Sequence, residues 1–473
     1  MSNKNEADLY DQMIDGESTK VKEDKMNDLR LSIHTKERDR RLEEIRSLSW
    51  WDRNFRPMEK GSLRGVVIMW IRMTLGVGVL TLPQYISGYG YVYGVLAIIA
   101  AGLLNLHSFR NIFHVSASTG EKDYLNLIEK TLGKVIFKIF KVSFFLDMSS
   151  SFVILVIVCW NLFEYSLYFL GVAKDEWFSD KDKMKFNEDN PELFRIRGVF
   201  FLILYLISIP FFLRKTLRAI QKITVMILFI LLILLVFIIG QAPFFYMANS
   251  DSERIAFKPF KTSWIEGFFS ILLSFYVQPF IFSLREELLV PSKKRMNKVA
   301  SITVSFEIIL FVAVAIAGYF SLGEKYITDL FLTRKPYNGE SPIIENIYRI
   351  LIGVFFFLSS LGIAIFNPTM RDYLYQVLNL NKSKISYVSL SLVPFFFYSL
   401  VAFIKPNIID VFNWTGLTIC NFNGYMIPAL MMIQILRQEG APKWRIGIEV
   451  FQVIALAILC VLGVYFKYQT SSS

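Results

Sequence analysis

The chain of 473 residues is 54% hydrophobic, contains 44 phenylalanines and has a mean hydropathy of +0.43. Soluble proteins do not carry this much apolar side chain, so the composition excludes a soluble domain and indicates a polytopic membrane protein. The net charge of +11 would suggest nucleic-acid binding in a soluble chain. Here most basic residues lie in short segments between apolar runs, where they mark membrane topology, and we expect no nucleic-acid partner.

The first 60 residues are rich in charged side chains of both signs, as in the run HTKERDRRLEEIR at 34–46. This pattern is typical of a solvated segment that is partly helical or disordered. We therefore expect residues 1–60 to form a cytosolic N-terminal tail and residues 61–470 to form one transmembrane domain.

About eleven apolar segments follow the tail, each near the ~20 residues that a helix needs to cross a bilayer. The predicted spans are 64–86, 91–113, 142–170, 197–213, 220–241, 265–285, 299–322, 347–370, 385–404, 411–436 and 445–466. Basic residues gather in the connections after spans two, four and six, and the positive-inside rule places these connections and the N-terminus in the cytosol. We expect a plasma-membrane or vacuolar/lysosomal-type location.

The first span contains the run VIMWIRMTLGVGVLTLPQYI at 67–86, which a plain membrane anchor does not need. Gly76 and Gly78 weaken a helix, and Pro83 removes a backbone donor. Backbone groups freed in lipid require a partner. In secondary transporters that partner is the substrate or a coupling ion. The alternative is a glycine face packed against a neighbouring helix.

The sixth span is also irregular, because Gln278 and Pro279 interrupt the run GFFSILLSFYVQPFIFSLREELLVP at 267–291. Spans one and six lie five spans apart. Paired irregular spans in corresponding halves indicate an inverted-repeat transporter with a binding site near the membrane midplane.

Ionisable residues inside membrane spans are costly and are candidates for function; here they are Arg72, Asp147, Glu164 and Glu307. We expect Asp147 and Glu164 to lie near the ends of the third span and to have structural roles. Glu307 lies roughly 12 Å into the seventh span, at ~1.5 Å per residue. It is either a proton site or an ion-pair partner.

Five motifs in order resemble the amino acid/auxin permease family of eukaryotic amino acid transporters. They are GVGVLTLP (76–83), QPFIFSLREELLVPS (278–292), AGYFSLGEKYITDLFL (317–332), NPTMR (367–371) and MIPALM (426–431). Leu322 stands where the family usually has Phe, and NPTMR resembles the Pro and Arg that close the eighth helix. The resemblance covers about 60–470. It implies an all-α fold like that of the bacterial leucine transporter, with two five-helix inverted repeats, an eleventh helix, and helices one and six broken around the substrate.

Under that fold, the substrate site lies at the two breaks. On the first span the candidates are Thr74, Leu75, Gly76, Val77 and Gly78. Free N–H groups and a positive helix end there would hold an α-carboxylate. On the sixth span the candidates are Ser274, Phe275, Tyr276 and Gln278, where carbonyls would accept from the α-amino group and an aromatic ring would bound the side-chain pocket. The alternative is that these residues only pack.

The resemblance also bears on coupling. Sodium-coupled members of the family have an Asn four residues before the first motif glycine, and here that position is Arg72; Ser359 and Ser360 are the nearest hydroxyl candidates on span eight. Arg offers no lone pair and keeps its charge at any working pH. We therefore predict sodium-independent transport that is proton-coupled or facilitative, with Glu307 as the first candidate for a proton carrier. The alternative is that Arg72 snorkels to the cytosolic face.

The chain shows no nucleotide-binding loop, catalytic triad or metal-ligand spacing, so we expect neither an enzyme nor a cofactor. The expected partners are an amino acid, protons and the lipid bilayer. The family resemblance favours a transporter of small neutral amino acids. The other hypothesis is a membrane sensor of the same fold that binds an amino acid and signals through its tail.

Overall fold

The computed structural model describes residues 63–180, 183, 185–187, 190–213, 218–288, 291–337, 339–363, 367–378, 380–381, 383–404 and 408–472. The chain divides into two units, residues 1–65 with 287–290 and residues 66–286 with 291–473. The contacts described below belong to the second unit. The expected tail at 1–60 lies outside the described residues.

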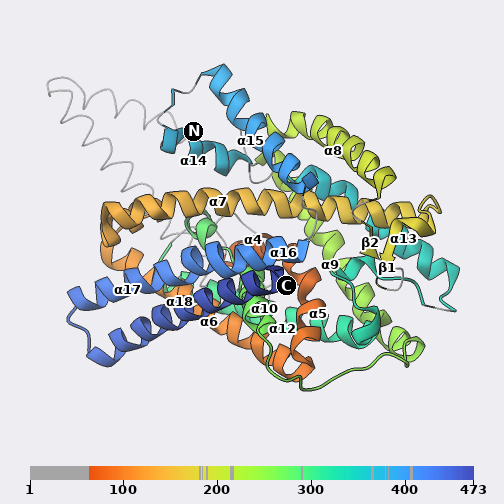
Figure 1. Ribbon diagram of the computed structural model, residues 1–473. Coiled ribbons are helices and arrows are strands. Elements are labelled where there is room, and N and C mark those ends of the chain that lie inside the picture. Colours follow the sequence, from red (N-terminus) through yellow and green to blue (C-terminus); the bar gives the residue numbers. More distant parts are fainter. Residues whose placement is uncertain are drawn as a thin grey trace, which may run out of the picture. The chain divides into compact units, whose positions relative to one another are not determined.

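The described elements are almost all helical (Figure 1). In chain order the α-helices are α4 (Leu63–Thr74), α5 (Val77–Tyr89), α6 (Tyr91–Thr119), α7 (Tyr124–Phe169), α8 (Pro191–Phe212), α9 (Arg218–Ala248), α10 (Ser263–Ser274), α11 (Ile281–Glu286), α12 (Lys293–Tyr326), α13 (Pro342–Gly362), α14 (Asn367–Leu378), α15 (Lys384–Ile404), α16 (Ile408–Trp414), α17 (Ile427–Gln438) and α18 (Lys443–Ser472). The remaining elements are η1 (Asp175–Trp177), a hairpin of β1 (Phe178–Asp180) with β2 (Lys185–Phe186), η2 (Gln278–Phe280), η3 (Phe331–Thr333) and the π-helix η5 (Thr415–Met426). Among the described residues ten spans are long and apolar enough to cross a membrane, or eleven with the bent pair α4–α5. The predicted all-α polytopic class is confirmed.

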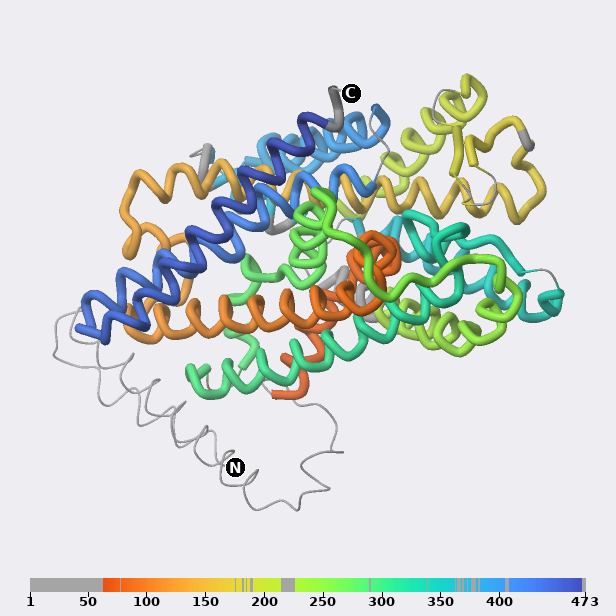
Figure 2. Tube along the Cα trace, turned by 60° about the horizontal axis from the view of Figure 1, so that its bottom comes forward, coloured from red at the N-terminus to blue at the C-terminus, as the bar shows by residue number. Residues whose placement is uncertain are grey.

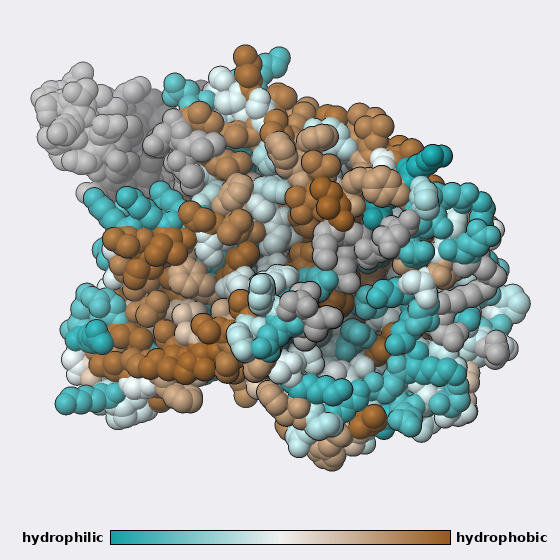
Figure 3. All heavy atoms as spheres, viewed as in Figure 1, coloured by the Kyte–Doolittle hydropathy of each residue, from teal (hydrophilic) through white to brown (hydrophobic). Residues whose placement is uncertain are grey.

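Helices far apart in the chain pack side by side in the second unit. α12 packs against α5, α6 and α9, and α17 packs against α18; Figure 2 shows both α6 beside α12 and α17 beside α18. Large apolar side chains such as Leu103, Ile309, Phe396 and Phe451 remain exposed, and Figure 3 shows apolar side chains over much of one face. Exposed apolar surface on this scale marks contact with a membrane.

The third span begins earlier than predicted. α7 starts at Tyr124, and it carries Lys130, Lys134 and Lys138, which the sequence analysis assigned to a connection. The three lysines are exposed, whereas Leu127 is buried. α7 is broken at Gly133, whose φ of 78° is not helical, so residues 124–132 form a separate short helix and the span itself begins near Lys134 rather than at 142. Lys134 and Lys138 share one face of that helix, because they are four residues apart.

The end of the eighth span was also wrongly predicted. α13 ends at Gly362, and the NPTMR motif at 367–371 begins a separate helix, α14. Arg371, expected in a connection, is only 3% exposed; its guanidinium donates to Ser391 Oγ at 3.2 Å and lies over the Tyr387 ring. Asn367 Nδ2 donates to the Phe212 carbonyl at 2.8 Å. These contacts stabilise α14 against α8 and α15.

Candidate functional site

The first span breaks where its glycines predict. α4 ends at Thr74, α5 begins at Val77, and the two halves meet at 59°. The Thr74 hydroxyl donates a hydrogen bond to the Trp70 carbonyl at 3.0 Å. No side chain caps the N-terminus of α5. The first N–H groups of a helix have no intrahelical partner and form its positive end. An anion therefore fits at this terminus. The side chain of Val77 lies outside the part of the chain that the structure describes.

The two glycines of the motif have different surroundings. A Cβ on Gly76 would meet nothing closer than the Thr74 carbonyl oxygen, at 4.0 Å. A Cβ on Gly78 would lie 2.6 Å from Ser274 Oγ and 2.8 Å from Ser274 Cα. Gly78 thus lets the first span approach the backbone of the sixth, which is the packing role left open by the sequence. Gly76 instead borders open space, and Leu75 before it is buried.

The sixth span breaks between α10 and η2, and side chains of the protein bond the freed backbone. Asn105 Nδ2 donates to the Phe275 carbonyl at 3.1 Å, and the Tyr425 hydroxyl donates to the Leu272 carbonyl at 2.9 Å. Gln278 Oε1 accepts from the Val277 N–H at 3.0 Å. Of the carbonyls expected to face a substrate amine, that of Phe275 therefore already has a partner within the protein.

Gln278 itself is buried, and its Nε2 donates to Asn105 Oδ1 at 2.8 Å. Asn105 and Tyr425 were not among the residues predicted from the sequence. The signal that could have found Asn105 is an amide within an apolar span, since buried polar groups in membrane helices need partners. Tyr425 comes from η5, and π-helical segments are frequent at functional sites.

Phe275 and Tyr276 point to different neighbours. Phe275 is fully buried and its ring centroid lies 4.6 Å from that of Phe311 on α12. The Tyr276 hydroxyl donates to Asp147 Oδ2 on α7 at 2.6 Å. Asp147 is 0% exposed in the middle of α7, so the prediction that it lies near the end of its span was wrong. The early start of α7 is the reason.

Glu307 is buried on α12, with 0% exposure. Neither of its carboxylate oxygens has a hydrogen-bond partner among the described residues, and the same holds for the Thr303 hydroxyl one turn earlier. Thr74, at the first-span break, lies beside the carboxyl group. The ion-pair alternative for Glu307 finds no partner in the described part of the chain.

The structure does not bring together all the expected coupling residues. Arg72 on α4 is half-buried, and its Nε has no hydrogen-bond partner among the described residues. Ser359 and Ser360 are buried on α13, where the Ser360 hydroxyl donates to the Phe356 carbonyl at 2.9 Å and lies beside Cys159 of α7. No hydrogen bond joins Arg72 to either serine in the described residues.

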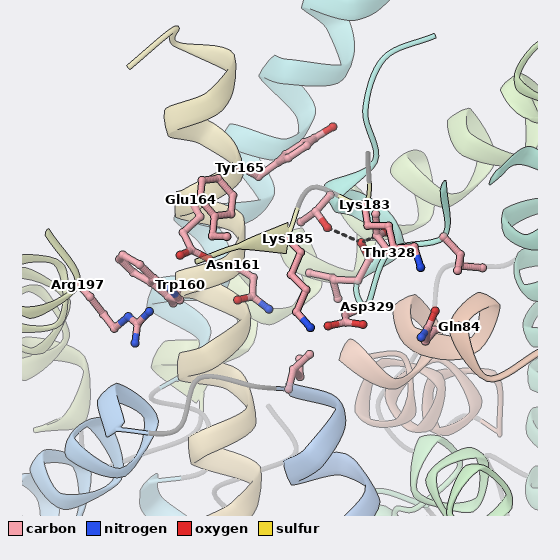
Figure 4. Close-up of a pocket in the computed structure, with 15 residues that line it drawn as sticks. Gln84, Trp160, Asn161, Glu164, Tyr165, Lys183, Lys185, Arg197, Thr328 and Asp329 are labelled. Atoms are coloured by element: carbon pink, nitrogen blue, oxygen red, sulfur yellow. Dashed lines mark hydrogen bonds between the residues drawn. The ribbon is translucent and has the colours of Figure 1, made fainter. Parts of the chain in front are cut away.

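A cavity of about 250 Å³ lies beside the far end of α5. Its walls include Gln84, less than two helical turns beyond Gly78 or roughly 9 Å along the axis. Figure 4 shows Lys185 of β2 and Asp329 directed toward one another, with Glu164 and Arg197 on the other side. Burial raises the pKa of Asp329, an effect that Lys185 opposes. Charges of both signs line the cavity, which suits a zwitterion.

Comparisons with known proteins agree with this architecture. A family model described as "Transmembrane amino acid transporter protein" matches residues 59–472. Amino acid transporter AVT6E of Arabidopsis thaliana is 21% identical over 396 residues, covering 80% of this chain and 77% of the relative. The putative amino acid transporter AAT1 of Plasmodium falciparum is 22% identical over 273 residues, covering 58% of this chain and 42% of the relative.

Among solved structures, MhsT in complex with L-phenylalanine superposes with a TM-score of 0.54 at 14% identity. The match covers 86% of this chain and all of that structure. It shows that the fold is that of the leucine-transporter type, as the family resemblance implied. With its broken first and sixth spans and a family match over nearly all its transmembrane part, the chain belongs to the transmembrane amino acid transporter family, the amino acid/auxin permeases.

Proposed function

We propose that the protein transports small neutral amino acids without sodium, binding the substrate at the first-span break. One observation carries the proposal: the uncapped N-terminus of α5 opens onto free space at Gly76. A substrate carboxylate there would accept hydrogen bonds from backbone N–H groups without a dedicated arginine. Family membership supports an amino acid as the substrate.

The preference for small substrates is supported by the close approach of the two breaks. Gly78 lies directly against Ser274, and the Phe275 ring packs against the Phe311 ring. Little room is left between the breaks for a large side chain. The charged cavity beside Gln84 would serve as a vestibule through which a zwitterion reaches the break.

Sodium independence is supported by the fixed charge of Arg72, which repels a nearby cation and cannot ligate it. Arg72 does not titrate, so a coupled proton needs another carrier. Glu307 is the carrier we propose, because it lies beside Thr74 at the break and has two unpartnered oxygens. The amino acid gradient alone would drive transport if Glu307 keeps its proton throughout the cycle.

The test is uptake of each amino acid by proteoliposomes that contain the purified full-length chain. We expect accumulation of small neutral amino acids that is unchanged when choline replaces sodium at constant pH. Uptake that collapses in choline would contradict sodium independence. Saturable binding without uptake or exchange of any amino acid would favour the sensor hypothesis instead.

A further inference from the structure

We infer that Asp147 is a proton-binding site that links protonation to the break of the sixth span. The inference rests on the proposed transport function and deepens it, because it assigns a proton to a carboxylate other than Glu307. It starts from three unpartnered buried atoms at one place in the fold. These are Asp147 Oδ1 and both polar side-chain atoms of Asn423.

Asp147 and Asn423 come from α7 and η5, which pack against each other. Asp147 Oδ2 accepts from the Tyr276 hydroxyl at 2.6 Å. The Asn423 side chain lies beside the carboxyl group, yet no hydrogen bond of normal geometry joins the two residues. An ionised Asp147 would therefore be a buried charge with one hydrogen bond, which is costly in a membrane interior.

No basic residue compensates the carboxylate in the described part of the chain, where no salt bridge to Asp147 occurs. The titratable groups that face it are hydroxyls and a thiol: Tyr124 of α7, Tyr276 at the break and Cys420 of η5. On α15, Tyr398 bonds to Ser149 rather than to Asp147. A positive charge at Asp147 must then come from a bound cation.

Of the possible cations, a proton fits this place best. A Cβ on Gly424 would lie 2.8 Å from the Tyr276 ring, so the ring packs directly on η5. A hard metal ion takes about six or more oxygen ligands, more than Asp147, Tyr276 and Asn423 supply. A proton from water forms an O–H bond on Asp147 Oδ1, and this group can donate to the Asn423 amide oxygen.

Tyr276 connects this proton to the movement of the sixth span. Its N–H donates to the Leu273 carbonyl at the end of α10, so the residue lies within the break. A hydrogen bond to an ionised carboxylate is stronger than one to a neutral acid. Protonation of Asp147 therefore weakens the bond that holds the break against α7, and deprotonation strengthens it.

Infrared spectroscopy of the full-length protein in lipid tests proton binding directly, through the C=O stretch of a protonated carboxyl group. The background is Glu307→Gln, which removes the other carboxyl group with 0% exposure among the described residues. We expect a band that titrates with pH in Glu307→Gln and is lost when Asp147→Asn is added. An absent band, or one that persists after Asp147→Asn, would overturn the inference.

Tyr276→Phe tests the role of the tyrosine as a positioning residue. Loss of its donor disfavours the ionised carboxylate, so the band should persist to higher pH, with proton binding about tenfold tighter. Tyr398→Phe is the matched control, because that hydroxyl packs on the same helix without touching Asp147, and it should leave the titration unchanged. Equal shifts in the two variants would remove Tyr276 from the proton site.

Proteoliposomes with a pH-sensitive dye inside separate this inference from the proposed function. We expect substrate-driven proton influx in the wild type. In Asp147→Asn we expect substrate exchange to persist while the number of protons per substrate falls, because Glu307 then remains as the only proposed carrier. Wild-type uptake without proton movement, or an unchanged number of protons per substrate in Asp147→Asn, would overturn the inference and leave transport standing. Absence of any amino acid uptake would reject the proposed function, and the infrared result would then decide proton binding on its own.

Discussion

At the first-span break, a Cβ on Gly76 meets nothing closer than 4.0 Å, and no side chain caps α5. At the sixth-span break, Asn105 bonds the Phe275 carbonyl and Tyr425 bonds the Leu272 carbonyl. Both breaks interrupt a helix inside the membrane, where unpartnered backbone is costly. The sixth break is thus completed by the protein, whereas the first leaves donors for a ligand. On this difference rests our proposal that the first break binds the substrate and that the sixth break supports the fold.

The largest effect should follow from Asn105→Ala at the supporting break. The substitution leaves the Phe275 carbonyl without its partner and Gln278 Nε2 with only the 3.5 Å contact to Ser108 Oγ. An unsatisfied buried group costs about 1–3 kcal/mol. We expect both the thermal stability and the uptake of this variant to fall. Tyr425→Phe is the milder control, because the Leu272 carbonyl still accepts a hydrogen bond from the Phe275 N–H. Normal stability in Asn105→Ala would show that the sixth break does not depend on these bonds.

Gly78→Ala should have the next largest effect, because its methyl group would meet the backbone of Ser274 at 2.8 Å. Overpacking of this kind costs roughly 1–3 kcal/mol, and it would push the two breaks apart. We expect reduced stability and reduced uptake, measured on protein that reaches the membrane. Adding Ser274→Gly removes the closest contact and should restore part of both. A double variant no better than Gly78→Ala would mean that the contact is not the cause.

Gly76→Ala sharpens the comparison, because it should spare the fold and still impair binding. A methyl group at position 76 meets no protein atom closer than 4.0 Å. It would, however, occupy part of the space that we assign to the substrate carboxylate. Losing one charge-assisted hydrogen bond costs about 1.5 kcal/mol, or roughly a tenfold rise in KM. Thermal stability should remain that of the wild type. Unchanged KM would place the substrate elsewhere.

The smallest effect should come from Asp329→Asn in the vestibule. Because burial raises the pKa of Asp329, this carboxyl takes up a proton at higher pH than an ordinary aspartate, and the Asn variant imitates the protonated form. Weakly buried charge pairs contribute up to about 1 kcal/mol, so KM should change by less than about fivefold. Wild-type KM should approach that of the variant as pH falls. A pH-dependent KM that survives unaltered in Asp329→Asn would exclude Asp329 from the access route.

Local patterns predicted the breaks but not what surrounds them. Gly76 and the Gln278–Pro279 pair weaken a helix wherever they stand, so both breaks could be located from the sequence. The bonds of Asn105 could not, because its partner Tyr425 is 320 residues away. The start of the third span was missed because Lys134 and Lys138 suggest a loop, although they lie exposed on the helix that follows the break at Gly133.

The central claim, that substrate binds at the first-span break, is tested most directly by a structure of the full-length chain in lipid with a transported amino acid bound. We predict that the substrate carboxylate accepts hydrogen bonds from the first N–H groups of α5, next to Gly76. Substrate bound only in the cavity beside Gln84, or held by the sixth-span break without contact to α5, would contradict the claim.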